Sequence, residues 1–258
     1  MTGGGDTTPF GGRPVKLSLH PVILGQSLSF PQLLELASKL GYQGVELHLQ
    51  YAKDVDRIAV RRLMSDYGQG VPTLGTGMAS AVDGLTFSHP DPALRRRAVE
   101  RVKEHIELAA FLDSAVIIGL LSGRLGNDAG QRPVLRQAAL ACLEECCRAA
   151  AGVGVTMLLE PLNRYECDYM NKVKDALDVT AQIGAPNLKL LADTFHMNIE
   201  EVDIAASLKQ AGPSLGHVHL ADSNRQAPGH GHLDIRSALE ALQQINYRGY
   251  LSFEVLPL

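Results

Sequence analysis

Four residues of metal-ligand type recur at nearly even intervals in the C-terminal half of the chain. Glu160, Asp193, His219 and Glu254 each end an apolar run, and successive members lie 33, 26 and 35 positions apart. Three carboxylates brought together would repel one another and acquire raised pKa values unless a cation neutralised them. Because oxygen donors with one imidazole suit Mn²⁺, Co²⁺ or Mg²⁺ better than Zn²⁺, we expect one divalent metal ion, with Mn²⁺ favoured.

The elements that must position these residues are also visible in the sequence. Short apolar runs alternate with longer amphipathic ones, which predicts a parallel sheet covered by helices. The spacing of the four residues matches one strand-helix unit of an eightfold barrel. Eight strands are expected, beginning at Val15, Gly44, Val71, Ala115, Val155, Leu188, Gly216 and Gly249.

A closed (β/α)₈ barrel is favoured over an open doubly wound sheet. No G-x-G-x-x-G or G-x-x-x-x-G-K-[ST] motif follows the first strand, and the candidate ligands are spread over four strand ends instead of one crevice. We therefore expect a single TIM-barrel domain over residues 15–258, preceded by a flexible leader over residues 1–14.

The last helix of such a barrel is absent from the sequence, because the chain stops soon after its eighth strand. The outer faces of the last and first strands, including Leu251 and Phe253, would then lack their usual cover. We expect a partner subunit or the leader to cover them. The sequence thus predicts a homo-oligomer, either a dimer or a tetramer.

Composition excludes several classes of protein. A net charge of -4 over 258 residues gives no electrostatic reason to expect nucleic acid as a partner. No apolar run reaches the roughly 18 residues of a membrane span, and no basic stretch followed by an apolar one begins the chain. The four cysteines lack paired metal-ligand spacing, so we expect buried free thiols and a cytoplasmic protein.

The segments EPLNRYE, DTFHMN, HLADSNRQAPGHG and FEV closely resemble the xylose isomerase-like barrel superfamily. Within it they are most similar to the ketose 3-epimerases related to tagatose and psicose 3-epimerase. The resemblance extends from Val15 to Leu256 in architecture and is specific in the second half. It implies that the four residues named first are metal ligands, and that the substrate is contacted by Glu166, His196 and Arg225.

The resemblance also implies a chemistry. A hydrogen next to a carbonyl is weakly acidic, so its removal requires stabilisation of the enediolate oxygen and a base within reach. A metal ion would act as Lewis acid and template, while Glu160 and Glu254 would flank the sugar as the catalytic pair. One carboxylate would remove the proton at carbon three and the other would return one to the opposite face, the roles exchanging with direction.

Several of these residues, and two nearby histidines, have an alternative interpretation. Glu166 could simply pair with Arg164, and Arg225 could be a solvated loop residue. His230 and His232 in the seventh-strand loop could meet a carboxylate or phosphate at the far end of the substrate, so a keto acid or sugar phosphate stays open.

Three further residues, His20, Glu46 and His48, end the first two strands. They are expected near the pocket wall, but the sequence assigns them no role.

Two other activities are compatible with this scaffold. An aldose-ketose or hydroxypyruvate-type isomerase would use the same metal and carboxylates, because it also passes through an enediolate. A zinc AP endonuclease is a more remote alternative. That class needs histidines on early strands and an Asp-x-His element, whereas the third strand VPTLGTGMAS has no histidine and PGHGHLD lacks Asp-x-His.

Overall fold

The computed structural model describes residues 15–21 and 28–256. The predicted leader, residues 1–14, lies outside the described residues. The strands are β1 (Lys16–Leu19), β2 (Gly44–Val45), β3 (Leu47–His48), β4 (Thr73–Gly75), β5 (Ala115–Ile118), β6 (Met157–Leu159), β7 (Leu188–Asp193), β8 (Leu215–Leu220) and β9 (Tyr250–Phe253).

Helices alternate with these strands along the chain. The α-helices are α1 (Phe30–Lys39), α2 (Arg57–Tyr67), α3 (Gly77–Ala81), α4 (Pro92–Leu112), α5 (Arg132–Ala151), α6 (Val173–Ile183), α7 (Thr194–Glu200), α8 (Ile204–Ala211) and α9 (Ile235–Gln244). Short 3₁₀ helices are η2 (Ala52–Asp54), η3 (Leu120–Ser122) and η4 (Gly212–Ser214).

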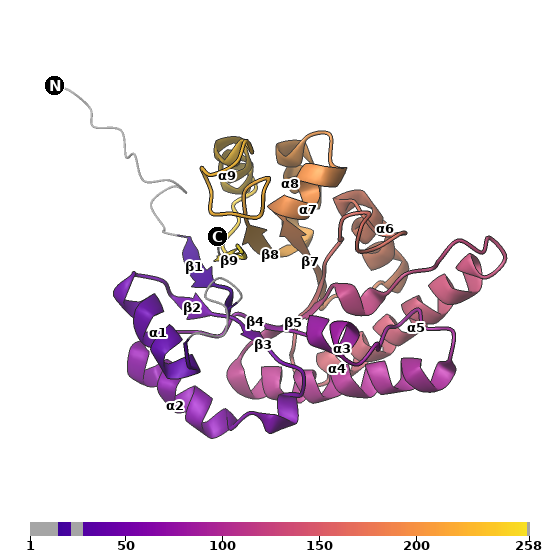
Figure 1. The fold of residues 1–258 in the computed structure, drawn as a ribbon, viewed down its shortest axis with the longest axis horizontal. Coiled ribbons are helices and arrows are strands. Elements are labelled where there is room, and N and C mark those ends of the chain that lie inside the picture. The colour runs from indigo at the N-terminus through magenta and orange to yellow at the C-terminus, as the bar shows by residue number, and fades with distance from the viewer. Residues whose placement is uncertain (1–14, 22–27, 257–258) are drawn as a thin grey trace.

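The strands form a nearly closed parallel barrel with helices outside it, which confirms the predicted fold class (Figure 1). Their order is β2-β1-β9-β8-β7-β6-β5-β4-β3. The predicted second strand, GVELHL, is divided at Glu46 into β2, which pairs with β1, and β3, which pairs with β4. This one segment therefore joins the two ends of the strand order.

Residues at the ends of α4 explain where this helix begins and ends. The Asp91 side chain accepts a hydrogen bond of 2.8 Å from the Ala93 N–H at the start of α4, and Pro92 occupies the first turn. The helix ends where Asp113 adopts a φ of 59°.

The cysteines are free thiols, as the sequence predicted. In α5, Cys146 and Cys147 are buried and Cys142 is partly buried, and Cys167 is also buried.

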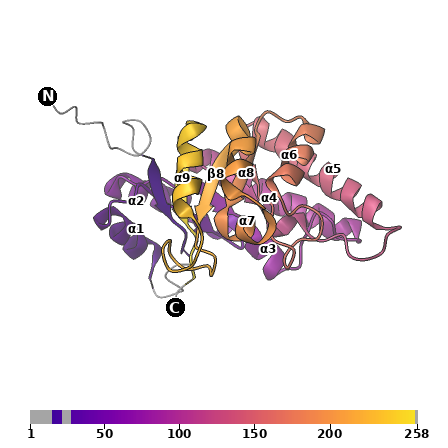
Figure 2. The same ribbon diagram turned by 90° about the horizontal axis from the view of Figure 1, so that it is seen from above.

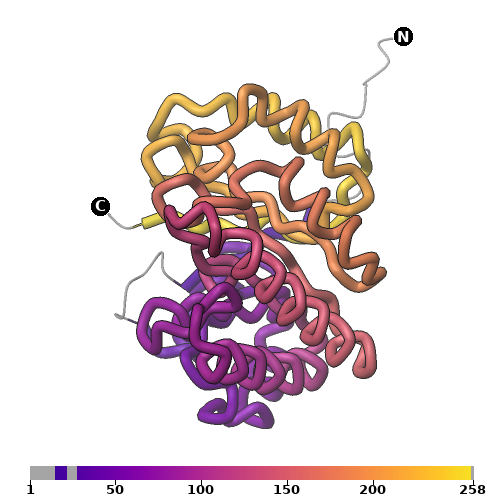
Figure 3. Tube along the Cα trace, turned by 90° about the vertical axis from the view of Figure 1, so that its right-hand side faces the viewer, coloured from indigo at the N-terminus to yellow at the C-terminus, as the bar shows by residue number. Residues whose placement is uncertain are grey.

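Segments far apart in the chain meet at the β1–β9 pair. Leu17 lies opposite Leu251 and Leu19 opposite Phe253 in the register of this pair. The indigo-to-magenta half and the orange-to-yellow part occupy opposite sides of the molecule (Figure 3). The β1–β9 pair therefore joins the first and last parts of the barrel.

No helix follows β9 within the residues described, which end at Leu256. The expectation that Leu251 would lack cover is nevertheless wrong, because its side chain is 3% exposed and belongs to the main apolar core together with Ala238, Ala241 and Leu242 of α9. Helices α8 and α9 lie side by side outside β8 (Figures 1 and 2). Phe253 is partly buried against the edge of Tyr42.

Because Leu251 is already buried within the chain, one reason for expecting a second subunit to cover this face is removed. The predicted dimer or tetramer stays a prediction, which sedimentation velocity can measure. Among the residues described, no helix has both the length and the apolar character needed to cross a lipid bilayer.

Candidate metal and substrate site

The four predicted ligands converge at the carboxyl ends of the barrel strands. Asp193 ends β7 and lies in register with His219 of β8, while Glu160 and Glu254 directly follow β6 and β9. One possible donor atom from each residue lies within 4.8 Å of the other three. Parallel strands bring their carboxyl ends to one rim, which explains why residues so far apart in the sequence meet here.

The cluster is deep in the molecule but open on one side. Asp193 and His219 are at most 1% exposed, and Glu160 is 7% exposed. His219 Nδ1 lies 3.8 Å from Glu160 Oε1 and 2.7 Å from Glu254 Oε2. The angles of the shorter contact are not those of a hydrogen bond, since His219 Nδ1 has no hydrogen-bond partner among the described residues.

The donor set fits a divalent cation. Asp193 Oδ2 is buried and accepts no hydrogen bond within the described residues, as His219 Nδ1 also lacks a partner. A buried polar atom left unsatisfied costs about 1–3 kcal/mol. A cation contacting both atoms would remove this cost and would neutralise the three carboxylates. These four residues could therefore hold a metal ion.

The two glutamates of the cluster have opposite electrostatic environments. Burial raises the pKa of Glu160 well above its usual range, and Glu254 and Asp193 add to this effect against the opposing His219. Burial would also raise the pKa of Glu254, but His20, His219 and Arg225 hold it well below its usual range. Without a cation, the surroundings therefore favour the protonated form of Glu160 and the ionised form of Glu254.

His219 completes the charge balance of the cluster. Burial would lower its pKa, but the carboxylates of Glu46 and Glu254 raise it well above the usual range. In the absence of a cation this imidazole therefore carries a positive charge. Metal binding would displace that proton, as it does at histidine ligands in general.

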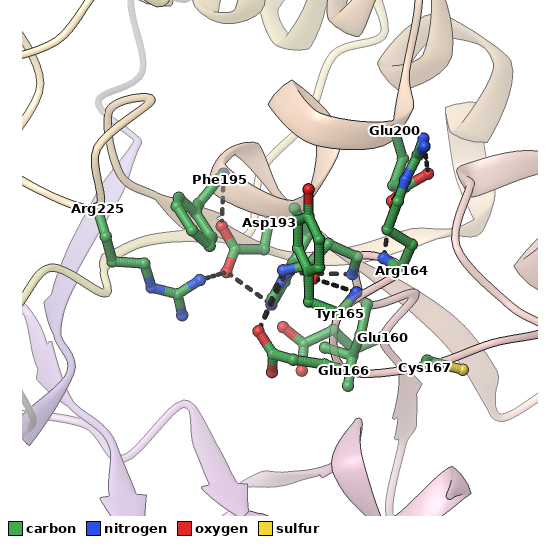
Figure 4. A network of polar contacts seen from close by, with 12 residues as sticks. Glu160, Arg164, Tyr165, Glu166, Cys167, Asp193, Phe195, Glu200 and Arg225 are labelled. Atoms are coloured by element: carbon green, nitrogen blue, oxygen red, sulfur yellow. Dashed lines mark hydrogen bonds and ion pairs between the residues drawn. The ribbon is translucent and has the colours of Figure 1, made fainter. Parts of the chain in front are cut away.

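Glu166 and His196 are brought together by a residue that the sequence did not single out. Asn163 Nδ2 donates to Glu166 Oε1 over 3.1 Å and lies 2.8 Å from His196 Nδ1. The alternative pairing of Glu166 with Arg164 is wrong, because Arg164 makes a two-pronged ion pair with Glu200, with both contacts at 2.9 Å (Figure 4). Asn163 lies within the EPLNRYE segment, three positions before Glu166.

Arg225 is not a solvated loop residue. Its guanidinium lies 3.1 Å from Asp193 Oδ2 and stacks over the Phe195 ring at 4.6 Å from the ring centroid (Figure 4). It also lies 2.9 Å from Glu254 Oε1. Its φ of 62° is in the left-handed region, which costs a non-glycine residue on the order of 1 kcal/mol. The two ion pairs hold it there, so Arg225 bridges two of the predicted ligands.

A cavity of about 280 Å³ lies over the cluster. Its lining includes Glu160, Glu254 and the three predicted substrate-contacting residues Glu166, His196 and Arg225. Early strands and the segments after them contribute His20, His48, Met78 and Leu120. His230 and His232 are exposed and are not among the residues that line it.

Glycine provides the room for one of the carboxylates. A Cβ at Gly119 would lie 2.5 Å from Glu160 Oε2, closer than real Cβ contacts allow. A side chain at this position would therefore displace the Glu160 carboxylate.

Behind the cluster lies a buried glutamate to which the sequence gave no role. Glu46 is fully buried; its Oε1 lies 2.7 Å from His217 Nε2 and its Oε2 lies 3.3 Å from His219 Nε2. Burial would raise the pKa of Glu46, but the two imidazoles hold it well below its usual range. The alternation that paired Glu46 with His48 was the available signal, but it did not show that Glu46 would contact a candidate ligand.

A parallel β/α barrel with acidic and imidazole side chains gathered at the carboxyl ends of its strands is an enzyme architecture. Residues 34–257 match the family described as xylose isomerase-like TIM barrel. The chain belongs to this family, and the resemblance inferred from its motifs is confirmed.

Proteins of similar sequence indicate the kind of enzyme. The chain is 31% identical over 219 residues to an L-ribulose 3-epimerase from Methylomonas sp. (strain DH-1), covering 84% of this chain and 75% of that protein. It is 31% identical over 231 residues to a D-psicose 3-epimerase from Enterocloster bolteae, covering 85% of this chain and 74% of that protein.

A solved structure agrees with these relatives. The D-allulose 3-epimerase from Methylomonas sp. in complex with D-allulose superposes with a TM-score of 0.83 at 28% identity, over 94% of this chain and 84% of that one. The protein is therefore an enzyme of the isomerase class.

Proposed function

We propose that the protein is a metal-dependent epimerase of ketoses or related keto sugars that inverts carbon three. The similarity to 3-epimerases of L-ribulose and D-psicose supports this substrate class. The observation that carries the proposal is that Glu160 and Glu254, which directly follow β6 and β9, line one cavity together with Glu166, His196 and Arg225.

Glu160, Asp193, His219 and Glu254 would hold the metal ion. When bound, such an ion polarises a carbonyl and an adjacent hydroxyl and so makes the neighbouring C–H more acidic. Mn²⁺ is the ion we propose; Co²⁺ and Mg²⁺ also suit these donors, and Zn²⁺ suits them less.

The chain's own residues orient the sugar. Glu166 and His196, linked through Asn163, form one side of the polar cavity wall, and Arg225 forms another. These groups would hold oxygens at the carbonyl end of the sugar, so that carbon three and not a neighbouring carbon faces the carboxylates. Arg225 also restrains Glu254 through a contact of 2.9 Å to Oε1.

Proton transfer would then use the two carboxylates from opposite faces. One glutamate takes the proton from carbon three and the other delivers a proton to the other face of the planar enediolate. The roles exchange when the reaction runs in reverse. The apolar side chains of Met78, Ala81, Leu120 and Leu162 also line this cavity.

Incubation in heavy water tests the proposal. We expect protein loaded with Mn²⁺ to place deuterium at carbon three of one or more ketoses, with inversion, in a panel of ketoses, ketose phosphates and keto acids. The variant Glu254→Gln should lose this exchange, while Glu240→Gln, on the exposed side of α9, should keep it. Mass spectrometry and NMR would locate the deuterium.

The outcome separates the alternatives. Exchange at carbon one alone would reassign the protein as an aldose-ketose or hydroxypyruvate-type isomerase. Cleavage of abasic DNA with Zn²⁺ supplied, and no exchange on any sugar, would favour the nuclease. Retained exchange in Glu254→Gln would contradict the role given to this carboxylate.

A further inference from the structure

Glu46 occupies an unusual position for an acidic residue. It stands between β2 and β3, where the second barrel strand is interrupted, and its side chain is fully buried. It does not line the cavity. Burying an ionised carboxylate is costly unless polar partners surround it, so its neighbours explain why it is tolerated.

Those neighbours are imidazoles. Oε1 lies 2.7 Å from His217 Nε2, and Oε2 lies 3.3 Å from His219 Nε2 and 3.7 Å from His48 Nε2. His217 and His219 come from the same strand, β8, and their rings are perpendicular with centroids 5.2 Å apart. One carboxylate therefore fixes two rings of the strand that carries a candidate ligand.

The contact with Glu46 determines which nitrogen of His219 is available. If Nδ1 gives its lone pair to a cation, the one N–H of His219 lies on Nε2, which faces Glu46 Oε2 at 3.3 Å, an ion-pair contact whose angles are not those of a hydrogen bond. Nδ1 then faces Glu160 and Glu254 and keeps its lone pair for a cation. A rotation of the ring that moved Nδ1 away would also break the contact with Glu46.

We propose that Glu46 is a positioning residue that fixes the tautomer and ring orientation of His219 for metal binding, with His217 holding Glu46 from its other oxygen. This inference rests on the proposed metal-dependent function. Carboxylate partners of ligating histidines typically change metal affinity by about 10- to 100-fold when they are removed.

The same carboxylate also belongs to a group with His20 and His48 whose donor atoms lie within 4.8 Å of one another, the geometry of a second metal site. The positioning role is favoured because Glu46 Oε1 is engaged by His217 and the whole side chain lies outside the cavity. The number of ions bound distinguishes the two.

Calorimetric titration of metal-free protein with MnCl₂ measures both the dissociation constant and the stoichiometry. We expect one Mn²⁺ per chain in the wild type. Glu46→Gln keeps the size of the side chain but cannot accept hydrogen bonds at both termini, so its dissociation constant should rise about 10- to 100-fold with the stoichiometry unchanged. Circular dichroism would confirm that each variant is folded at the titration temperature.

Two variants control for a merely structural effect. Glu200→Gln removes another buried, ion-paired carboxylate, one that contacts Arg164 and none of the four ligands, and should bind Mn²⁺ like the wild type. His217→Gln keeps an N–H donor for Glu46 and should retain affinity within a few-fold. Should Glu46→Gln fail to fold, His217→Leu, which removes that donor, should still weaken binding relative to His217→Gln.

Four results would overturn the inference. Wild-type affinity in folded Glu46→Gln would show that His219 needs no positioning, and equal losses in Glu46→Gln and Glu200→Gln would show a general effect of destabilisation. Two ions in the wild type and one in Glu46→Gln would make Glu46 a ligand itself. No Mn²⁺ binding by the wild type would remove the metal from the proposed function, and the positioning role with it.

Discussion

The substitution Gly119→Ala should impair catalysis by moving a single carboxylate. The new Cβ would lie 2.5 Å from Glu160 Oε2, whereas ordinary contacts begin at 3.4 Å, so the carboxylate must shift by about 0.9 Å (3.4 − 2.5). A misplacement of roughly 1 Å at a reacting group can cost about 100-fold in rate. We therefore expect kcat/KM to fall about 100-fold, which corresponds to ~2.7 kcal/mol of transition-state stabilisation.

The backbone at this position also disfavours alanine, because Gly119 has a φ of −111° and a ψ of −100°, which lies outside the α and β regions open to other residues. Some loss of melting temperature is therefore expected, and the loss of activity and Mn²⁺ affinity should persist at a temperature where circular dichroism shows that the variant is fully folded. Gly152→Ala, whose Cβ would have its nearest contact at 3.4 Å and which lies outside the cavity, is the matched control. Wild-type activity in Gly119→Ala would refute the assignment of Glu160 to the reaction.

Three further substitutions give distinct expected outcomes. Asn163→Ala should raise KM and lower kcat/KM about 10-fold in steady-state assays, because it removes the side chain that contacts both Glu166 and His196. Mn²⁺ affinity in calorimetry should be unchanged, because these contacts involve none of the four proposed ligands. Arg225→Lys should weaken both substrate and Mn²⁺ binding, since a lysine cannot bridge Asp193 and Glu254 with a planar fork. Asp222→Asn should lower the free energy of unfolding at pH 7 by about 1–3 kcal/mol, measured by urea denaturation, because the carboxylate accepts several backbone N–H bonds.

The pH dependence of the Asp222→Asn effect follows from the sign of the pKa shift. Burial opposes ionisation of Asp222, but backbone N–H groups of the following loop hold its pKa well below the usual range. A carboxyl whose pKa is depressed on folding stabilises the protein fully above its unfolded pKa of about 3.9, and this stabilisation is lost as the pH falls toward the folded value. The difference between wild type and variant should therefore shrink below about pH 4, and a difference independent of pH would contradict this account.

The convergence of the four ligands could be predicted because it depends on short-range patterns. Each strand is a nearly continuous apolar run, its end is marked by a polar residue, and the parallel barrel brings such ends to one rim. The register of β7 with β8, which sets Asp193 beside His219, was not itself predicted from the sequence. The sequence therefore contained both the fold class and the core of the candidate site.

Contacts between distant segments were not predictable in the same way. Glu46 and His217 are 171 positions apart, and their pairing depends on where the second strand is interrupted. The prediction that Leu251 would lack cover was wrong for a related reason: its side chain belongs to the same buried apolar core as residues of α9, which the periodicity of one strand does not show. Periodicity identifies faces of single elements, whereas these contacts depend on how neighbouring elements fill the same space.

The position of Glu254 also depends on contacts between distant segments. With no helix after β9 in the described part of the chain, the residues that follow the strand are tied to the loop after β8 instead. The Leu256 N–H donates to the Arg225 carbonyl over 2.8 Å, and the Arg225 side chain contacts Glu254. The backbone of Arg225 is fixed in turn, because its N–H donates to the carbonyl of Asp222. The Asp222 carboxylate accepts hydrogen bonds from other backbone N–H groups of the same loop.

The position of Glu254, one member of the proposed acid–base pair, therefore depends on a loop that contributes no proposed ligand. If this chain of contacts positions Glu254, Asp222→Asn should also lower kcat/KM at a temperature where the variant is fully folded, whereas a loop that only stabilises the fold would leave kcat/KM unchanged there. Mn²⁺ affinity should fall in parallel, because the same carboxylate is a proposed ligand. Steady-state kinetics and calorimetry on the same folded sample would decide between these two roles.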